Sequence, residues 1–312
     1  MEISQEDQPL VTIVIPTYNR FGFVQQAIAS VITQTYNHWE LIIVDDGSED
    51  GTAGAIISMN DSRIKLLGMK HSGNIASLRN AGVKAGSGEW LAFLDSDDLW
   101  VPGKLEIQLQ TLFKEEKSWG YGGFELMNSE REKIPNKLGI YRPLSGWIIK
   151  ELLTNEASVN IGTLILKRLL FEEAGGFNED AELLYREDYE LVIRIALRAE
   201  ALAIPDILVR VREHYGRSTN AFEYGNERTA AVYEYFIRTR PEKKLAKIAR
   251  RRMAGELTEA AVKRIRQRKY SQAANRLWKA FINGDHWRHL LSALRRGFSS
   301  SLQSGYRSNQ TS

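Results

Sequence analysis

The sequence predicts an α/β protein, with a mostly parallel central sheet flanked by helices and a helical C-terminal extension. In the first hundred residues, short β-rich apolar runs alternate with segments that carry apolar residues at helical spacing. This is the pattern of a parallel sheet covered by helices. Two of the apolar runs end directly in acidic clusters, and the last quarter of the chain is helical in pattern and rich in Lys and Arg.

The strands and helices expected in the first hundred residues follow each other in regular βα order. Strands are predicted at 11–16, 41–44, 64–67 and 90–94, and helices at 21–33, 52–59 and 75–85. In open α/β sheets, ligands bind beyond the carboxyl ends of the strands, where the loops converge. The residues that follow positions 44 and 94 should therefore lie close together at that edge.

The pattern is less regular after residue 100. We expect an amphipathic helix at 103–116, short strands and loops with an acceptor-side role over 119–165, a helix at 187–199 and a strand at 204–212. From residue 227 the pattern is helical to about residue 297, and a Ser-, Gly- and Gln-rich tail follows, for which disorder is predicted. We divide the chain into a catalytic domain at 1–237 with its motifs at 10–215, a basic helical extension at 238–298, and a tail at 299–312.

Composition limits the chemistry and the location. The 312 residues are 43% hydrophobic and include no cysteine. Disulfides and thiolate catalysis are therefore excluded, and a metal would need oxygen or histidine ligands. The first ten residues are acidic and polar, and the longest apolar runs are strand-sized, so we expect neither a secretory signal nor a membrane span. These features favour a cytoplasmic protein.

The charges are unevenly distributed. Residues 1–237 carry 23 basic and 35 acidic side chains, a balance of −12, whereas the remainder carries 19 basic and 4 acidic side chains, a balance of +15. An acidic body with a basic appendage suggests that the appendage contacts an anionic partner.

Three carboxylates, those of Asp95, Asp97 and Asp98, directly follow the strand predicted at 90–94. They repel one another unless a cation lies between them, and carboxylate oxygens are preferred ligands of Mg²⁺ and Mn²⁺. A divalent ion held there can also bind diphosphate oxygens and neutralise charge on a departing phosphate. The alternative is that Asp97 or Asp98 caps the following helix. The strand-end position and the third acid favour the metal site.

Asp45 and Asp46 directly follow the strand predicted at 41–44. A carboxylate at this position can accept a hydrogen bond from a base N–H or from ribose hydroxyls, and it can equally well cap the helix that begins near Gly51. Arg79, in the helix at 75–85, can offer a fork of donors to a diphosphate, the alternative being an unpaired surface arginine.

Two further candidates lie late in the predicted domain. Glu187 and Asp188 open a helix, which would place one carboxylate in the cleft, where it can take a proton from an acceptor hydroxyl. Acids in a first helical turn also occur simply because they complement the helix dipole. His214 can complete a metal shell through an imidazole nitrogen, or it is a surface histidine.

Taken in order, five segments resemble glycosyltransferase family 2, whose catalytic domain has the GT-A fold. They cover most of residues 10–215. The segments are VTIVIPTYNR at 11–20, ELIIVDDGSEDGT at 40–52, GNIASLRNAGVKAGSGEWLAFLDSDDLW at 73–100, GTLILKRLLFEEAGGFNED at 162–180 and REDYELVIRIAL at 186–197. Each one alone is a weak signal, whereas five in the family's order are specific.

The resemblance implies roles for the donor-side residues. Pro16, Thr17 and Tyr18 are similar to the residues that line the family's nucleoside pocket, and Asp46 is similar to the carboxylate that reads the base. Arg79 resembles the diphosphate partner.

The resemblance also implies the metal site and the base. Asp95 and Asp97 resemble the DxD pair, with Asp97 as the direct ligand of Mn²⁺ or Mg²⁺ and Asp95 nearer the ribose and sugar. His214 matches a less regular position that is sometimes a further metal ligand, and Asp188 resembles the catalytic base.

The family's chemistry is inverting. The resemblance therefore implies transfer of a sugar from a nucleotide diphosphate sugar, with UDP favoured, to a hydroxyl of a glycan or lipid-linked acceptor in cell-envelope or exopolysaccharide assembly. Two other functions compete with it. A nucleotidyltransferase usually presents a basic, glycine-rich loop after its first strand, whereas this chain has Pro-Thr-Tyr-Asn-Arg at 16–20. A non-catalytic nucleotide-sugar-binding protein is disfavoured by the complete acidic set.

Three interpretations of the basic extension remain open. Its basic clusters, at 243–252 and 263–269, are interleaved with apolar residues, and Trp278 and Phe281 follow. The first is a bundle that packs its apolar stripe on the catalytic domain and leaves a basic face in solvent. The second is a peripheral membrane segment that lies on anionic lipid with aromatic residues at the interface. Nucleic-acid binding is the least favoured, because basic stripes alone are not specific.

Overall fold

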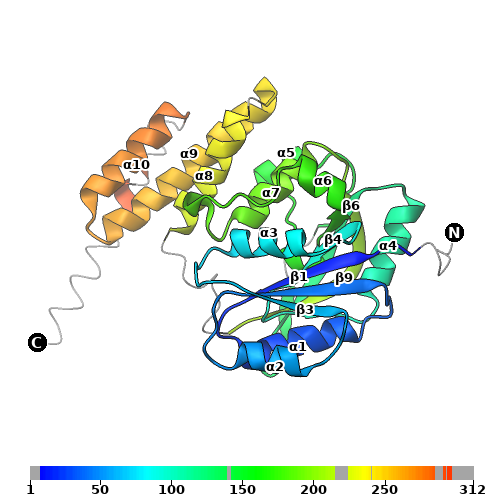
Figure 1. Cartoon of the computed structure of the whole chain (residues 1–312). Helices are drawn as coiled ribbons and strands as arrows, with labels where there is room; N and C mark the ends of the chain where they lie inside the picture. The colour runs from blue at the N-terminus through cyan, green and yellow to red at the C-terminus, as the bar shows by residue number, and fades with distance from the viewer. Residues whose placement is uncertain are drawn as a thin grey trace, which may run out of the picture. The chain divides into compact units, whose positions relative to one another are not determined.

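The chain divides into two compact units, residues 1–220 and 221–312, in a computed structural model (Figure 1). The structure describes residues 8–138, 142–214, 224–239, 241–284, 291–292 and 294–296. The unit boundary comes earlier than the expected one at 237/238, because helix α8 (Gly225–Arg238) packs against α9 (Lys243–Arg266) of the second unit. The predicted tail at 299–312 lies outside the described residues.

The first unit is built on one mixed sheet, with β1 (Val11–Thr17) in parallel register between β2 (Trp39–Asp45) and β4 (Trp90–Phe93). Among the described residues the strand order is β3-β2-β1-β4-β8-β6-β9-β5, and β7 pairs with β6. The remaining strands are β3 (Ile64–Gly68), β5 (Leu99–Trp100), β6 (Trp119–Met127), β7 (Lys133–Leu138), β8 (Ile165–Lys167) and β9 (Leu202–Arg212). The antiparallel strand β8 separates the four parallel strands β1 to β4 from a second parallel pair, β6 and β9.

Helices cover both faces of the parallel strands. Figure 1 shows α1 (Phe21–Ile32) and α2 (Thr52–Ser58) on one face and α3 (Ile75–Ala85) on the other. The first unit also contains α4 (Lys104–Lys114), α5 (Ile149–Thr154), α6 (Arg168–Glu173) and α7 (Glu187–Ala196). The predicted strands and helices of the first hundred residues are confirmed to within about two residues at each end.

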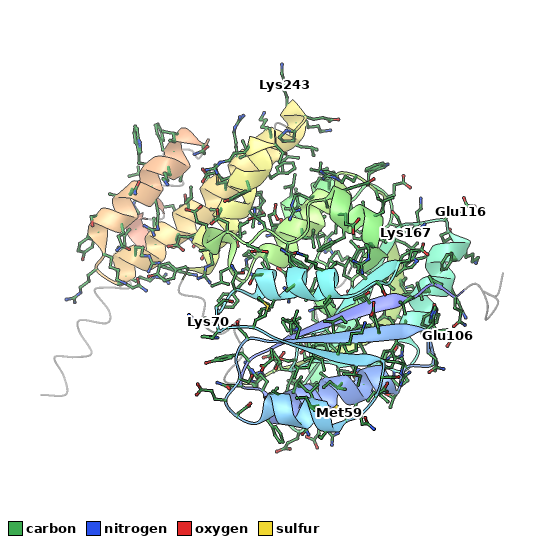
Figure 2. All side chains as sticks on the ribbon, in the orientation of Figure 1. Met59, Lys70, Glu106, Glu116, Lys167 and Lys243 are labelled. Atoms are coloured by element: carbon green, nitrogen blue, oxygen red, sulfur yellow. The ribbon has the colours of Figure 1, made fainter. Side chains whose placement is uncertain are left out.

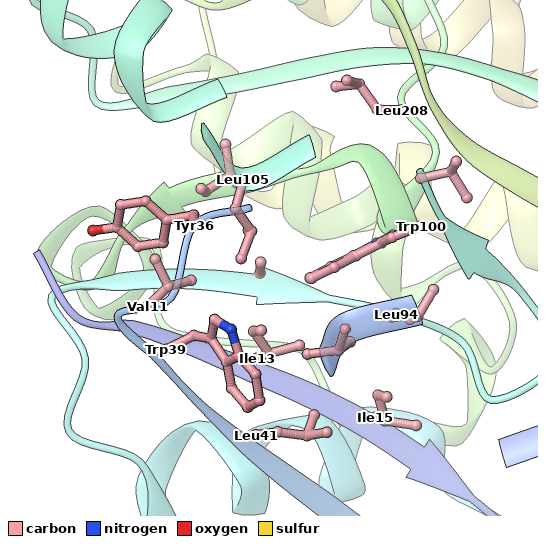
Figure 3. Packing of buried hydrophobic residues seen from close by; sticks show 14 of the residues in the cluster. Val11, Ile13, Ile15, Tyr36, Trp39, Leu41, Leu94, Trp100, Leu105 and Leu208 are labelled. Carbon is pink, nitrogen blue, oxygen red and sulfur yellow. The ribbon is translucent and has the colours of Figure 1, made fainter. Parts of the chain in front are cut away.

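Alternating residues of β1 pack against the helices on opposite faces of the sheet. Val11, Ile13 and Ile15 belong to a buried cluster with α1 and α4 (Figure 3). On the other face, Gly82 of α3 lies so close to Val14 that a Cβ atom at Gly82 would come within 2.4 Å of a Val14 methyl. The helix can therefore approach the strand closely, which brings the start of α3 to the edge where the strands end.

The second unit contains α8, α9 and α10 (Tyr270–Ile282), and Figure 2 labels Lys243 where α9 begins. Ala261 and Ile265 of α9 pack against Ala273 and Leu277 of α10. The C-terminal part of the apolar stripe predicted along α9 is thus packed inside this unit. Among the described residues, no helix is both long and apolar enough to cross a bilayer.

Candidate active site

The loops that follow β1, β2 and β4 converge on an open cavity of about 250 Å³. Six of the residues predicted for the site line it, namely Pro16, Thr17, Tyr18, Asp46, Asp95 and Asp97. It is also lined by four residues that were not predicted from the sequence, namely Arg20, His71, Gly73 and Tyr185. The cavity lies where an open α/β sheet is expected to bind ligands.

A larger hollow, of about 650 Å³, lies beside the start of β4 and β6. It is lined by apolar side chains such as Trp90 and Phe113 and by the Lys117–Glu200 ion pair. It contains none of the residues predicted for the site, and the carboxyl ends of the parallel strands do not open into it. We therefore assign the chemistry to the smaller cavity.

Asp46 supports one wall of the cavity. The residue is only 1% exposed. Its carboxylate accepts hydrogen bonds from the backbone N–H groups of Ser72 at 2.9 Å and Gly73 at 2.8 Å, and His71 Nδ1 lies 2.9 Å away. These contacts fix the loop after β3 against the end of β2. A direct contact between Asp46 and a nucleotide base remains a prediction.

The alternative in which Asp45 or Asp46 caps the helix that begins near Gly51 is wrong. Asp50, not Asp45 or Asp46, accepts the hydrogen bond from the backbone N–H of Thr52 at the start of α2. Asp45 instead accepts hydrogen bonds from the backbone and the hydroxyl of Ser48. Asp45 therefore closes the turn after β2, Asp46 holds the loop after β3, and neither caps the helix.

An aromatic pair forms another part of the wall. The rings of Tyr18 and His71 stack with their centroids 4.0 Å apart and their planes 18° apart. Tyr18 is 41% exposed although it is aromatic. A flat, partly exposed pair of this kind provides a stacking surface for a planar ligand. His71 could not be predicted from the sequence, because it lies in a loop with no recognisable motif. Folding of the chain brings it next to Tyr18.

Arg79 occupies a different position from the one predicted. It is 2% exposed and is not among the residues that line the cavity. Its guanidinium donates to Glu187 Oε1 at 2.6 Å and to Asp95 Oδ1 at 2.7 Å. The surface alternative is wrong, and two arms of the fork predicted for a diphosphate are held by carboxylates of the protein. Arg79 thus connects the helix that starts with Glu187 to the acidic loop after β4.

The carboxylates around Arg79 have shifted pKa values. Burial, with a smaller contribution from the neighbouring Asp188 carboxylate, raises the pKa of Glu187 to about 7 despite the opposing charge of Arg79. Desolvation also raises the pKa of Asp95, again against Arg79, with repulsion from Asp97 adding to the effect. Burial lowers the pKa of Arg79, but the adjacent carboxylates outweigh burial and raise it overall. The cluster is thus crowded with negative charge around one arginine.

Asp97 and His214, both predicted as metal ligands, meet at the cavity although they are 117 residues apart. His214 Nε2 lies 2.8 Å from Asp97 Oδ2, and Arg20 Nη1 lies 3.4 Å from the same histidine nitrogen. Only 7% of the His214 side chain is exposed, so it is not an ordinary surface histidine.

The donor set at Asp97 and His214 suits a Mn²⁺ or Mg²⁺ ion, because it pairs a carboxylate oxygen with an imidazole nitrogen beside an open cavity. Among the described residues, no group of three or more acidic or histidine side chains is arranged to hold a metal. An ion at this site would therefore take its other ligands from substrate phosphate or water, as Mg²⁺ commonly does.

Asp98 has a structural role. Its Oδ1 accepts the backbone N–H of Arg212 at 2.9 Å, and the Arg212 guanidinium donates in return to the Asp97 carbonyl at 2.8 Å. The alternative in which Asp97 or Asp98 caps a helix is wrong, because β5 follows them and Gly103 precedes α4. These contacts lock the acidic loop to β9, and His214 follows that strand by two residues.

Asp188 lies in the first turn of α7, beside Glu187. It is partly exposed, and its charge acts on both Asp95 and Arg79. Tyr185, three residues earlier, lines the cavity with an uncommon positive φ of 65°. The turn before α7 therefore borders the cavity. Its acids also lie at the positive end of the helix dipole, so the two interpretations of Asp188 do not exclude each other.

Comparison with known proteins connects this geometry to a family. The model of the Glycosyl transferase family 2 matches residues 12–171, about half of the chain. An Escherichia coli UDP-Glc:alpha-D-GlcNAc-diphosphoundecaprenol beta-1,3-glucosyltransferase, WfgD, is 42% identical over 123 residues, which are 39% of this chain and 49% of WfgD. The putative teichuronic acid biosynthesis glycosyltransferase TuaG of Bacillus subtilis is 36% identical over 122 residues, 38% of this chain and 48% of TuaG.

Solved structures share the fold over nearly the whole chain. The crystal structure of S. aureus TarS 1-349 in complex with UDP-GlcNAc aligns with a TM-score of 0.68 at 17% identity, covering 96% of this chain and 92% of TarS 1-349. The mannosyltransferase PcManGT of Pyrobaculum calidifontis, in complex with GDP-Man and Mn²⁺, aligns with a TM-score of 0.58 at 20% identity, covering 97% and 84%. The predicted GT-A fold is confirmed by these alignments.

The chain matches about half the length of WfgD and of TuaG. The match to the family model includes the aromatic wall at Tyr18, the acidic loop at 95–98 and the helix that carries Arg79. The chain belongs to glycosyl transferase family 2.

Proposed function

We propose that the chain is an inverting glycosyltransferase that moves a sugar from a nucleotide diphosphate sugar, preferably a UDP-sugar, to a hydroxyl of a glycan or lipid-linked glycan. The name of WfgD states a UDP-Glc donor and a diphosphoundecaprenol-linked acceptor, and TarS was crystallised with UDP-GlcNAc and with UDP. TuaG is named for teichuronic acid biosynthesis. These relatives favour a role in cell-envelope or exopolysaccharide assembly.

The observation that carries the proposal is that Asp97 and His214 meet beside the same cavity that the Tyr18–His71 stack lines. In this assignment the nucleoside lies on the aromatic pair and against Pro16 and Thr17. Its diphosphate points toward the acidic loop. Arg20, which lines the cavity next to Asp97, donates to the phosphate oxygens in place of the buried Arg79.

The carboxylate of Asp97 and the imidazole of His214 would hold a Mn²⁺ or Mg²⁺ ion. Such an ion supplies charge neutralisation for the departing diphosphate. Asp95 lies on the sugar side of this pair. Its carboxylate keeps one oxygen on Arg79 and can turn the other toward a ribose or sugar hydroxyl. Arg79 is then a positioning residue that keeps Asp95 in place through the Glu187 contact.

Asp188 serves as the base. It takes the proton from the acceptor hydroxyl while the acceptor oxygen attacks the anomeric carbon, and the bond from that carbon to the diphosphate breaks on the opposite side. A single displacement inverts the configuration. An α-linked donor should therefore give a β-linked product, and a product with retained configuration would contradict the assignment.

Calorimetric titration of UDP, GDP and several of their sugars, with and without Mn²⁺, tests the donor site. We expect one nucleotide series to bind more tightly with Mn²⁺, and this metal dependence should be lost in Asp97→Ala. Asp206→Ala is the matched control, because Asp206 is an exposed acid on β9 outside the cavity. Donor binding without any transfer would support a non-catalytic binding protein. No binding by a folded sample would reject the donor site.

A further inference from the structure

Helix α10 has apolar residues on two faces. One face, with Ala273 and Leu277, packs against α9. The other consists of Tyr270, Ala274, Trp278, Phe281 and Ile282, whose spacing of four, four, three and one residues places them along one side of a helix. We call this second set the exposed α10 face.

The large side chains of the exposed α10 face are unusually accessible. Tyr270 is 51% exposed, Trp278 63%, Phe281 49% and Ile282 59%. The Trp278 and Phe281 rings stack with their centroids 6.1 Å apart, so the exposed area is continuous. Single exposed hydrophobic residues are normal on soluble proteins, whereas a contiguous patch that includes tryptophan marks a surface for a partner or a membrane.

The acids that the structure describes in this unit do not neutralise the basic charge next to this face. Glu227 pairs with Arg264 and Arg276, while Glu234, Glu256 and Glu259 pair with Arg238, Arg252 and Arg296 respectively. Within the described part of the chain, Arg266 and Arg268 just before α10, and Lys279 on it, form no ion pair. All three are exposed. The exposed α10 face therefore has an apolar centre and cations at its border.

We propose that the exposed α10 face lies on an anionic lipid bilayer, with Trp278 and Phe281 at the level of the headgroups and Arg266, Arg268 and Lys279 contacting lipid phosphates. Amphipathic helices bind in the plane of a bilayer by combining buried apolar area with attraction to anionic lipid. Tryptophan is enriched at such interfaces. This inference goes beyond the proposed function, because it depends on none of the assigned substrates.

Two other partners fit the observations less well. Residues 238–312 carry 19 basic and 4 acidic side chains, so two copies of this region repel each other. A nucleic acid would need cations at the centre of the contact, to reach successive phosphates, whereas here the centre is apolar.

The test is co-sedimentation of the full chain with phosphatidylcholine vesicles, with and without phosphatidylglycerol. We expect binding that requires phosphatidylglycerol and weakens as salt rises. The double variant Trp278→Glu/Phe281→Glu should lower partitioning by roughly 10-fold or more, because it removes apolar contact and adds negative charge. The variant Arg266→Glu/Arg268→Glu should lower it as well and reduce its salt dependence.

The control is Ile57→Glu/Leu169→Glu, since these residues are 70% and 64% exposed in the first unit. It should partition like the wild type. Circular dichroism checks that each variant folds, and UDP binding checks the donor site separately, so failure of one proposal does not imply failure of the other. Absent vesicle binding, equal binding to neutral vesicles, or unchanged binding by the Trp278→Glu/Phe281→Glu protein would overturn the inference. Self-association that this variant alone abolishes, without vesicle binding, would assign the face to a second copy instead.

Discussion

Two acidic clusters lie at the ends of β2 and β4, the strands on either side of β1, and they differ in what neutralises them. Asp45 and Asp46, after β2, accept hydrogen bonds mainly from backbone N–H groups and serine hydroxyls of nearby loops. Asp95 and Asp97, after β4, instead meet the side chains of Arg79, Arg20 and His214. The first cluster is built into the wall of the cavity, whereas the second faces cationic groups.

This difference distinguishes a structural role for the first cluster from a chemical role for the second. Backbone donors cannot leave without unfolding the loop that they belong to, so Asp46 is committed to the loop at 71–73. A carboxylate held by side chains can change partners when substrate or metal arrives. An acidic pair at a strand end is therefore not by itself a sign of catalysis, and substitutions in the two regions should affect different measurements.

The largest effect is expected on the side of the second cluster, at Asp188. Asp188→Asn keeps the shape of the side chain and removes the base, so turnover should fall by roughly 10²- to 10⁴-fold while donor affinity stays close to that of the wild type. Initial transfer rates and UDP titration on the same samples measure the two quantities. Turnover equal to that of the matched control Asp206→Asn would reject Asp188 as the base.

A smaller effect, on stability instead of turnover, is expected at the first cluster. Asp46→Asn replaces one acceptor oxygen with an amide NH₂ that faces the N–H groups of Ser72 or Gly73. The free energy of unfolding should fall by about 1–3 kcal/mol, as expected when a buried donor loses its partner. Urea unfolding measures this change.

Asp97→Asn provides the matched comparison, since it should leave the free energy of unfolding nearly unchanged. Its carboxylate accepts no backbone hydrogen bond in the described structure, and removing its charge relieves repulsion on Asp95. If Asp97→Asn destabilised the protein as much as Asp46→Asn, the distinction between the two clusters would fail.

The last expected effect concerns the pH dependence of stability, and it is at most similar in size to the effect at Asp46. Burial raises the pKa of Glu187 from 4.5 to about 7, so between these pH values the folded protein keeps a proton that the unfolded chain has lost. The free energy of unfolding should therefore fall as pH rises through this window and level off above it. The contribution is at most on the order of 3 kcal/mol.

Glu187→Gln cannot ionise, so urea unfolding of this variant from pH 4.5 to 7 should show a weaker decline than that of the wild type. The two proteins should have similar stabilities at the low end of the range, where Glu187 is protonated. Identical slopes for both proteins would show that Glu187 does not titrate in this window.

Several parts of the site were predictable because their signals are local. The buried runs that become β1, β2 and β4 are continuous in the sequence, and the acids at their ends are adjacent to them. A strand that ends at the edge of a parallel sheet places the residues that follow it at that edge, and this placement does not depend on distant parts of the chain. Six predicted residues therefore line one cavity.

Other parts were not predictable because they depend on partners far along the chain. Arg79 lies 108 residues from Glu187, and its burial between two carboxylates changes it from a diphosphate ligand to a positioning residue in our assignment. His71 acquires its role by stacking on Tyr18, and α8 joins the second unit by packing on α9. No pattern within a single segment encodes these contacts.

Hydrophobic periodicity and ordered motifs depend on residues close together in the chain, so the strands, the helices, the acidic edge and the family could be predicted from them. Which carboxylates are satisfied, which face a cation and which apolar face of α10 stays exposed follow only from the folded chain. The physical reason is that burial and hydrogen bonding depend on groups that folding brings together from distant parts of the chain. A side chain's chemistry here is set by those neighbours as much as by its own type.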